Sequence, residues 1–246
     1  MIAQVPVEFM QWAGCISYHE ACDLLALRSR APLETEASIN LALSKTRIKL
    51  TADGLCSTVQ DDDRLLATWD ELQMIADKKQ GCYALYDDGS KPWHVSTISS
   101  SSGIPASLCP PLQASGAPTM ILGGFTMHRI AGDDMNPTVD TAAKLSCFRF
   151  FPGASVLDTC MGLGYTALGA ARKVGPSGRV VTVEYDAASV EMAAHNPWST
   201  GLFDGTLPVE VYQGDSCEIV RQFPAQTFNF VCHDPPARAL SRTDVR

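Results

Sequence analysis

From Ala154 to Cys232 the chain alternates short apolar runs with segments of helical periodicity, and this alternation limits the possible folds more than any other feature. Four apolar runs predict strands, at residues 155–158, 179–184, 207–212 and 228–232. The segments between them predict helices, at residues 165–174, 187–195 and 216–223. Apolar strands that alternate with helices form parallel sheets through right-handed crossovers. We therefore predict an α/β fold here, with about four parallel strands.

The part of the chain before this alternation has a mixed pattern that predicts a small α+β domain. Capping-box patterns predict helices at residues 17–28 and after Thr68, and a further helix is expected at 138–148. Strands or hairpins are expected around glycine-containing turns, at residues 38–57, 82–98 and 119–130. A stretch rich in Ser, Pro and Gly at 99–116 predicts a loop. We place an N-terminal domain at 1–117 and a second domain at 118–246.

Composition excludes several classes of function. The formal charge of −8 and the pI near 5.0 argue against wrapping of nucleic acid, which needs a basic face. No apolar run is long enough to span a membrane, and Met1 to Trp12 lacks the pattern of a secretory signal. The nine cysteines form no CxxC pair and no zinc-site spacing, so we expect no metal site. Reduced thiols and a cytoplasmic location are expected.

A glycine-containing turn follows the first strand of the alternating part. It runs from Asp158 through Thr159, Cys160 and Gly162 to Gly164, where the next helix begins. Glycines remove Cβ atoms, so backbone amides at the start of a helix can approach a ligand. A purely structural loop is the alternative for such a turn considered alone.

Acidic residues stand at the ends of the next two strands. Glu184 ends the second strand about 20 residues after the glycine turn, where a carboxylate can accept hydrogen bonds from both ribose hydroxyls of a nucleoside cofactor. Asp215 follows the third strand and can accept a hydrogen bond from an adenine amino group. Asp215 is also a suitable N-cap for the helix at 216–223, and one residue can serve both roles.

The fourth strand leads into His233, Asp234, Pro235 and Pro236. Ligands of open α/β sheets bind at the carboxyl ends of the strands. There Asp234, with its backbone fixed by two prolines, can orient a nucleophile. A proline-stiffened loop is the structural alternative. Four successive strand ends thus carry residue types that a nucleoside cofactor needs.

At this point the chain resembles the class I S-adenosylmethionine-dependent methyltransferases. It is more closely similar to predicted methyltransferases described chiefly from archaea, which are distantly similar to spermidine synthases. Five stretches carry the resemblance: VLDTCMGLGYT at 156–166, NPWS at 196–199, HDPP at 233–236, PLETEASINLALSKTRIKL at 32–50 and GAPTMILGGFTMHRI at 116–130. The resemblance implies a Rossmann-like sheet, S-adenosyl-L-methionine as cofactor and an undefined methyl acceptor. The turn from Asp158 to Gly164 would accommodate the methionine part of the cofactor.

Two departures from the family pattern stand out. Cys160 replaces a glycine that is usual in methyltransferase loops, and only residues 237–246 follow Asp-Pro-Pro, where the family continues with a helix and three more strands. From this we expect a C-terminally truncated sheet whose fourth strand is an open edge. Such an edge would allow self-association, and it places activity in question more than fold.

Alternatives remain at this stage. A polyamine aminopropyltransferase is disfavoured, because the loop after the fourth strand carries few carboxylates. A non-catalytic module that completes its sheet with a partner is also open. The Asp-Pro-Pro sequence at 234–236 resembles the turn of enzymes that methylate amino groups or bases, so an amino nitrogen or a nucleobase is the preferred acceptor. For His128 and Arg129 a strand histidine beside a surface arginine is favoured over a place in the pocket, and Trp198 is expected to pack against the sheet.

Overall fold

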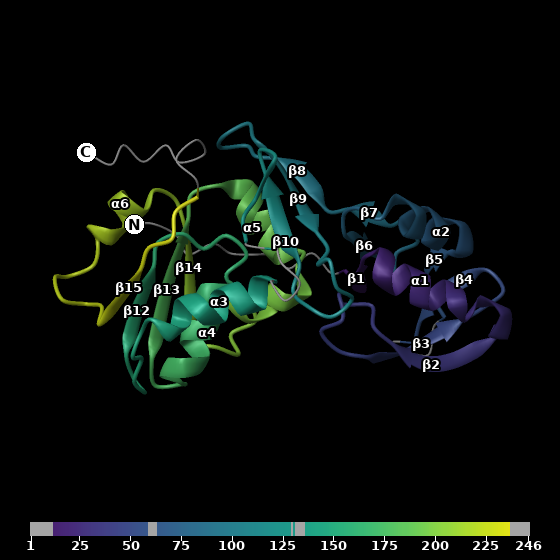
Figure 1. Ribbon diagram of the computed structural model, residues 1–246, viewed down its shortest axis with the longest axis horizontal. Coiled ribbons are helices and arrows are strands. Elements are labelled where there is room, and N and C mark those ends of the chain that lie inside the picture. The colour runs from purple at the N-terminus through teal and green to yellow at the C-terminus, as the bar shows by residue number, and fades with distance from the viewer. Residues whose placement is uncertain (1–11, 59–62, 129, 131–135, 237–246) are drawn as a thin grey trace.

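The fold is described from a computed structural model, which covers residues 12–58, 63–128, 130 and 136–236. The molecule is elongated, with a mixed α and β part at one end and a parallel sheet with helices at the other (Figure 1). A small antiparallel sheet lies between them. None of the helices in the described ranges has the length and apolar character needed to cross a bilayer.

The N-terminal part consists of two helices and two antiparallel sheets around one apolar core. Helices α1 (Tyr18–Ala26) and α2 (Trp69–Lys78) pack against each other. One sheet has the order β2-β3-β4-β5, with strands at Leu33–Ala37, Thr46–Leu50, Gly54–Ser57 and Leu65–Thr68. The other has the order β1-β6-β7, with strands at Gly14–Ile16, Tyr83–Leu85 and Trp93–His94. Their shared core contains Leu24, Ile48, Leu72 and Ile75, all fully buried.

Both predicted capping boxes are confirmed. The Ser17 hydroxyl accepts from the backbone at the start of α1, and the Glu20 carboxylate accepts from the Ser17 N–H at 2.8 Å. Thr68 and Glu71 make the same exchange at the start of α2. Two otherwise unpaired N–H groups are satisfied at each helix start, which explains why these local patterns predicted both helices.

Alanine in place of Ser17 should lower the free energy of unfolding by about 1–2 kcal/mol, because it removes the cap of a buried helix start. The loss also takes away the 2.6 Å hydrogen bond from the Ser17 hydroxyl to Glu20. Urea denaturation of the variant measures the change. Ser100→Ala, in an exposed turn, is the matched control and should leave stability unchanged. Equal stability of the two variants would contradict the capping role.

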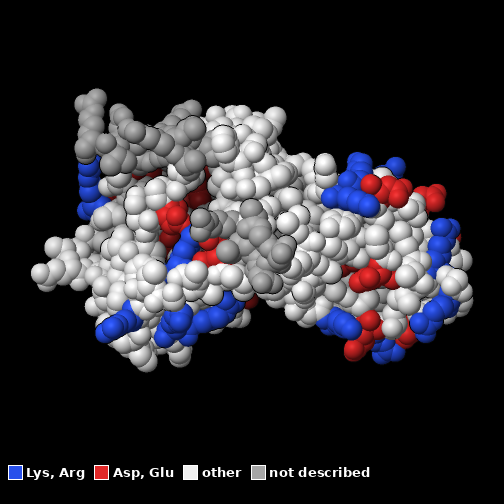
Figure 2. Space-filling view, viewed as in Figure 1, with Lys and Arg blue, Asp and Glu red and all other residues white. Residues whose placement is uncertain are grey.

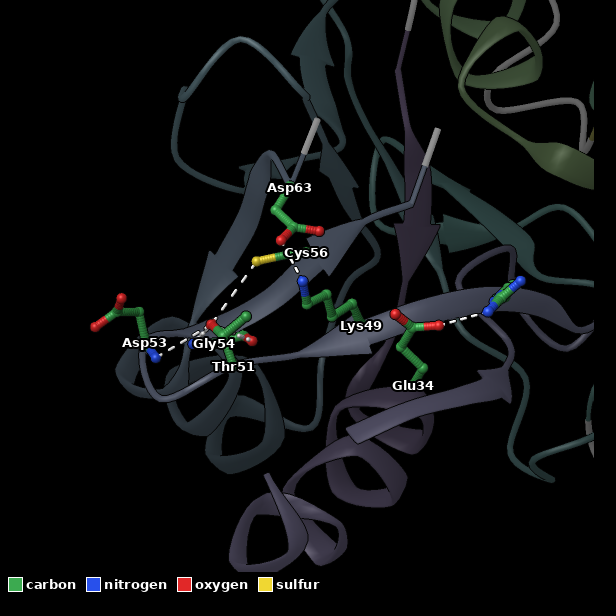
Figure 3. A network of polar contacts seen from close by, with 8 residues as sticks. Glu34, Lys49, Thr51, Asp53, Gly54, Cys56 and Asp63 are labelled. Carbon is green, nitrogen blue, oxygen red and sulfur yellow. Dashed lines mark hydrogen bonds and ion pairs between the residues drawn. The ribbon is translucent and has the colours of Figure 1, made fainter. Parts of the chain in front are cut away.

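The predicted turn at Asp53 and Gly54 is confirmed and joins β3 to β4. The Thr51 hydroxyl accepts from the N–H groups of Asp53 and Gly54 at 3.2 and 3.3 Å, and beside it Lys49 pairs with Asp63 (Figure 3). Gly54 has φ +156°, and a Cβ there would lie 2.1 Å from the Ala67 carbonyl oxygen. Only glycine fits this close approach of β4 to β5.

Two strand predictions in this half need correction. The strand predicted within 38–57 covers β3 and β4 but misses β2, because residues 38–45 are not a strand and the preceding segment LETEA pairs with β3 instead. The predicted loop at 99–116 contains β9 (Pro105–Cys109). Its Ser and Pro content concealed an alternation in which Ala106 and Leu108 are buried.

β9 belongs to the middle sheet. The order of this antiparallel sheet is β11-β10-β9-β8, with β8 at Ser96–Ile98, β10 at Thr119–Leu122 and β11 at Phe125–Thr126. β9 and β10 pair along four positions, so strand pairing runs across residue 117. The division of the chain into domains at that residue stays a prediction.

The parallel sheet has the predicted α/β architecture. Its four strands have the order β14-β13-β12-β15 and are all parallel. They are β12 (Ser155–Asp158), β13 (Arg179–Glu184), β14 (Val209–Gln213) and β15 (Phe230–Cys232). In chain order this is third, second, first, fourth, which matches the first four positions in the strand order of a doubly wound Rossmann sheet.

Helices cover both faces of this sheet. They are α3 (Pro137–Ser146), α4 (Tyr165–Val174), α5 (Ala187–Ala194) and α6 (Ser216–Val220), with a 3₁₀ helix, η3, at Pro197–Leu202. Alternate strand residues face opposite cores: Val156 and Val180 belong to the large core with α4, whereas Leu157 and Val181 pack with Ile219 of α6. The bounds predicted for β12, α4 and β13 agree with the structure, because these elements are apolar and end at glycines or acids.

Candidate functional site

A cavity of about 810 Å³ lies at the carboxyl ends of the four parallel strands. The opposite wall comes from the middle sheet, through Met120, Leu122 and Phe125, and α3 forms one side. In Figure 2 acidic and basic atoms lie against one another in the region above α3. Eight of the ten residues predicted for the site line this cavity: Thr159, Cys160, Gly162, Glu184, Asp215, Asp234, Pro235 and Pro236.

The glycine turn forms the floor of the cavity. Gly162 has φ +54°, and a Cβ built there would meet nothing within 4 Å, so open space lies above its backbone. Gly164 has φ +78° and is the N-cap of α4. A Cβ on Gly164 would lie 2.3 Å from Leu202 of η3. Gly164 therefore allows α4 to pack closely against η3 and does not line the cavity, and its contact with a cofactor stays a prediction.

Glu184 joins the end of β13 to the glycine turn. Its Oε2 accepts from the Gly162 N–H at 2.8 Å, and its Oε1 accepts from the Asp186 N–H at 2.8 Å. Burial raises the pKa of Glu184, while these backbone N–H groups act in the opposite direction. Each carboxylate oxygen has a second lone pair, so Glu184 can still accept hydrogen bonds from a ligand in the cavity.

Asp158 lies beneath the turn and does not line the cavity. Its side chain is 1% exposed, and its Oδ2 accepts from the Thr182 hydroxyl at 2.8 Å. Burial raises the pKa of Asp158 to about 7. The carboxyl of Asp158 is enclosed between β12 and β13, and the contact with a cofactor that the sequence predicted for it stays a prediction.

Cys160 stands in the cavity wall where related loops have glycine. Burial raises the pKa of its thiol to about 11, so the thiol stays protonated at neutral pH and is not a nucleophile. Its small side chain leaves the floor of the cavity open.

Asp215 has the predicted N-cap role, whereas its contact with an adenine amino group stays a prediction. Its Oδ1 accepts from the Cys217 N–H at 2.7 Å, which caps α6, and its side chain is exposed at the cavity wall. The neighbouring Gly214 N–H donates to the Glu184 carbonyl oxygen at 2.8 Å. Asp215 thus lies beside the end of β13, close to Glu184.

An ion-paired cluster at the other end of the cavity was missed from the sequence. The Lys144 ammonium lies 2.5 Å from Asp234 Oδ2 and 2.8 Å from Asp140 Oδ2. Asp140 and Lys144 are four residues apart on α3, a spacing that the predicted helix at 138–148 already contained. Nothing local in the sequence indicated that this helix face meets the loop after β15.

His128 also lines the cavity, so the favoured interpretation as a simple strand histidine was wrong. Its Nδ1 lies 3.0 Å from the Thr119 hydroxyl, and its ring centroid lies 5.2 Å from that of Tyr165. Burial lowers the pKa of His128 to about 4, with a contribution from the charge of Lys144. Arg129 lies outside the described residues.

The sequence predicted the position of one aromatic residue, Trp198, and missed that of another, Tyr185. Trp198 packs against the large core as expected, and its indole N–H donates to the Leu41 carbonyl oxygen at 2.9 Å. Tyr185 was not singled out, yet it is 47% exposed and lines the cavity directly after Glu184. The signal available in the sequence was an aromatic residue directly after the acid that ends β13, and it could have indicated that Tyr185 lines the site.

Comparison with known proteins gives partial matches. No protein-family model matches the chain. An uncharacterised protein of Methanocaldococcus jannaschii is 38% identical over 124 residues, which are 50% of this chain and 41% of that protein. The chain therefore spans well under half the length of this curated relative.

Among solved structures, TrmN from Thermus thermophilus is 27% identical, with 41% of this chain and 29% of that chain covered and a TM-score of 0.34. An S-adenosylmethionine-dependent methyltransferase from Aquifex aeolicus is 26% identical over 38% of this chain and 47% of that chain, with a TM-score of 0.31. An O-methyltransferase from Bacillus cereus, in complex with S-adenosylhomocysteine, is 26% identical over 41% and 46%, also with a TM-score of 0.31. Each structural match covers less than half of either chain.

Proposed function

We propose that this chain binds S-adenosyl-L-methionine and is a methyltransferase, or the cofactor-binding part of one. The observation that carries the proposal is the hydrogen bond from the Gly162 N–H to Glu184 on the floor of a cavity at the carboxyl ends of β12 and β13. It places a glycine turn open to the cavity beside the acid that ends the second strand. This is the combination that binds a nucleoside cofactor in a Rossmann-like sheet.

The residues of the cavity fit this cofactor. Glu184 retains lone pairs for two ribose hydroxyls, and Asp215 can accept from the adenine amino group. Thr159, Cys160 and Gly162 leave room for the methionine part. The bound cofactor would supply a methyl group on a sulfonium, which a nucleophile displaces in line. Asp158 and Gly164 support this arrangement from behind the wall.

The charges of the cavity also favour a cationic cofactor. Five carboxylates line it, against Lys144 as the only lysine or arginine among the described lining residues: Asp140, Glu184, Asp186, Asp215 and Asp234. Such a surface attracts the positive sulfonium and repels anionic ligands. A polyamine acceptor was disfavoured because the loop after the fourth strand carries few carboxylates. The five carboxylates of the whole cavity weaken that argument.

The acceptor end of the cavity carries Asp234, Pro235 and Pro236. We propose that Asp234 orients an amino nitrogen or a nucleobase nitrogen, with the prolines holding the loop in place. The cytoplasmic location and self-association at the edge strand β15 stay predictions.

Isothermal titration of the purified chain tests the proposal. S-adenosylmethionine and S-adenosylhomocysteine should bind at one site, whereas NAD, which shares the adenosine group but lacks the sulfonium and methionine parts, should bind far more weakly. Absence of binding even at millimolar ligand would contradict the proposal. Turnover with decarboxylated S-adenosylmethionine and spermidine, but not with the intact cofactor, would assign aminopropyl transfer instead.

A further inference from the structure

We propose that His128 is a second catalytic residue of this site, whose Nε2 accepts the proton that the acceptor nitrogen loses as it is methylated. The inference rests on the proposed methyltransferase function and deepens it, because it also defines the chemical class of the acceptor. The sequence alone favoured a structural role for His128.

The position of the His128 ring is fixed by its neighbours. Nδ1 is held at 3.0 Å from the Thr119 hydroxyl on β10, and Thr119 is fully buried. One face of the ring lies against Tyr165, whose own hydroxyl donates to the Pro118 carbonyl oxygen and accepts from Asn196. With a proton on Nδ1 donated to Thr119, Nε2 is an acceptor. It has no hydrogen-bond partner in the part of the chain that the structure describes.

His128 belongs to the acceptor end of the cavity. The charges of Lys144, Asp140 and Asp234 all act on its ring, and all four residues line the cavity. Asp234 pairs with Lys144 through Oδ2, which leaves Oδ1 available. An –NH₂ group has two hydrogens, so one can be donated to Asp234 and the other to Nε2, and the nitrogen lone pair then remains free for the methyl group.

The proton balance is complete with these groups. The nitrogen lone pair forms the new N–C bond, and the C–S bond of the sulfonium breaks with its electron pair left on sulfur. The proton lost by the nitrogen goes to His128 Nε2, and the resulting imidazolium releases it to water as the product leaves. Lys144 pairs with Asp234, and its charge opposes a lasting positive charge on His128.

The apolar wall of the cavity defines the acceptor together with the state of the His128 ring. Burial lowers the pKa of His128 to about 4, so the ring is neutral at pH 7 and its Nε2 lone pair can accept a proton. It can accept a proton from a ring-bound amine, because methylation makes such a nitrogen strongly acidic. The apolar wall of Met120, Leu122 and Phe125 suits a flat ring. We therefore assign the acceptor as an exocyclic amine on an aromatic ring.

Variants at His128 test the role while the cofactor site is left intact. His128→Gln, with an amide near the position of Nε2, and His128→Asn should bind S-adenosylhomocysteine within about threefold of the unmodified chain. Both should lose at least about 100-fold in methyl transfer to adenine, cytosine or aniline. His94→Gln, on β7 outside the cavity, is the matched control and should keep full activity. Ethylamine should not be methylated.

Nitrogen NMR of the histidine-labelled chain gives a readout independent of turnover. His128 should stay neutral down to about pH 5 with its proton on Nδ1, and Thr119→Val should shift the balance between its two neutral forms. Transfer retained in His128→Gln, methylation of ethylamine in preference to the ring amines, or a proton resident on Nε2 would overturn the inference. Cofactor binding without transfer to any ring amine would overturn it too and leave the proposed cofactor site standing. Failure to bind the cofactor would instead refute the proposed function.

Discussion

Alanine in place of Glu184 is expected to weaken binding of S-adenosylhomocysteine by roughly 100-fold. The Glu184 carboxylate accepts hydrogen bonds from the N–H groups of Gly162 and Asp186, both at 2.8 Å. Its remaining lone pairs are proposed to accept hydrogen bonds from the ribose hydroxyls. Truncation removes the ribose contacts and leaves two N–H groups without their acceptor. The glycine turn then loses its side-chain contact with β13 and is held there by the hydrogen bond from the Met161 N–H to the Val183 carbonyl oxygen. Isothermal titration of the variant measures the loss.

Glu210→Ala is the matched control for this change. Glu210 lies on the neighbouring strand β14, pairs with Arg179 at 2.6 Å and does not line the cavity. The Glu210→Ala substitution should leave the affinity for S-adenosylhomocysteine unchanged, even if it lowers the free energy of unfolding. Glu184→Gln should give an intermediate affinity, because one amide oxygen can replace only one of the two carboxylate acceptors. Equal affinities of the Glu184 and Glu210 variants would remove Glu184 from the site.

Asparagine in place of Asp158 is expected to stabilise the chain, and more so at high pH. The folded-state pKa of Asp158 is about 7, against about 3.8 for an ordinary aspartate. Between these values the folded chain holds a proton that the unfolded chain releases, so the free energy of unfolding falls as pH rises through this window and levels off above it. The full difference corresponds to about 4 kcal/mol. The uncharged amide would lack this loss and still accept from the Thr182 hydroxyl.

Urea denaturation between pH 4 and pH 8 measures this effect. The advantage of the variant over the unmodified chain should grow as pH rises and stay constant above about pH 7. Asp204→Asn is the matched control, because Asp204 also accepts from a threonine hydroxyl, at 2.6 Å, but is exposed. It should show no such trend. A constant difference between Asp158→Asn and the unmodified chain across the range would show that the buried carboxyl ionises normally.

The sequence predicted the parallel sheet well because its signals are local. The strand at 155–158 and the helix at 165–174 match β12 and α4, since apolar runs bounded by glycines and acids define both elements. β9 was missed for the opposite reason. Its Ser and Pro residues resemble a loop, and only pairing with β8 and β10, a tertiary contact, makes PASLC a strand.

The same difference between local signals and tertiary contacts applies to the residues of the candidate site. Glu184 and Gly162 were predictable, because a strand end and a glycine turn are local features with known consequences. Lys144 and His128 were not, because each precedes the parallel sheet in the chain and reaches the cavity only through folding. Lys144 and Asp234 are far apart in the sequence, and no local sequence pattern predicts the 2.5 Å ion pair between them.

The middle sheet has a consequence for how such a protein can diversify. Met120, Leu122, Phe125 and His128 stand across the cavity from the glycine turn, on a hairpin outside the Rossmann-like sheet. Under the proposed function, substitutions in this hairpin would alter the methyl acceptor without disturbing the floor formed by Gly162 and Glu184. Acceptor selectivity and cofactor binding could then be changed separately, for example by grafting other hairpins onto the same parallel sheet.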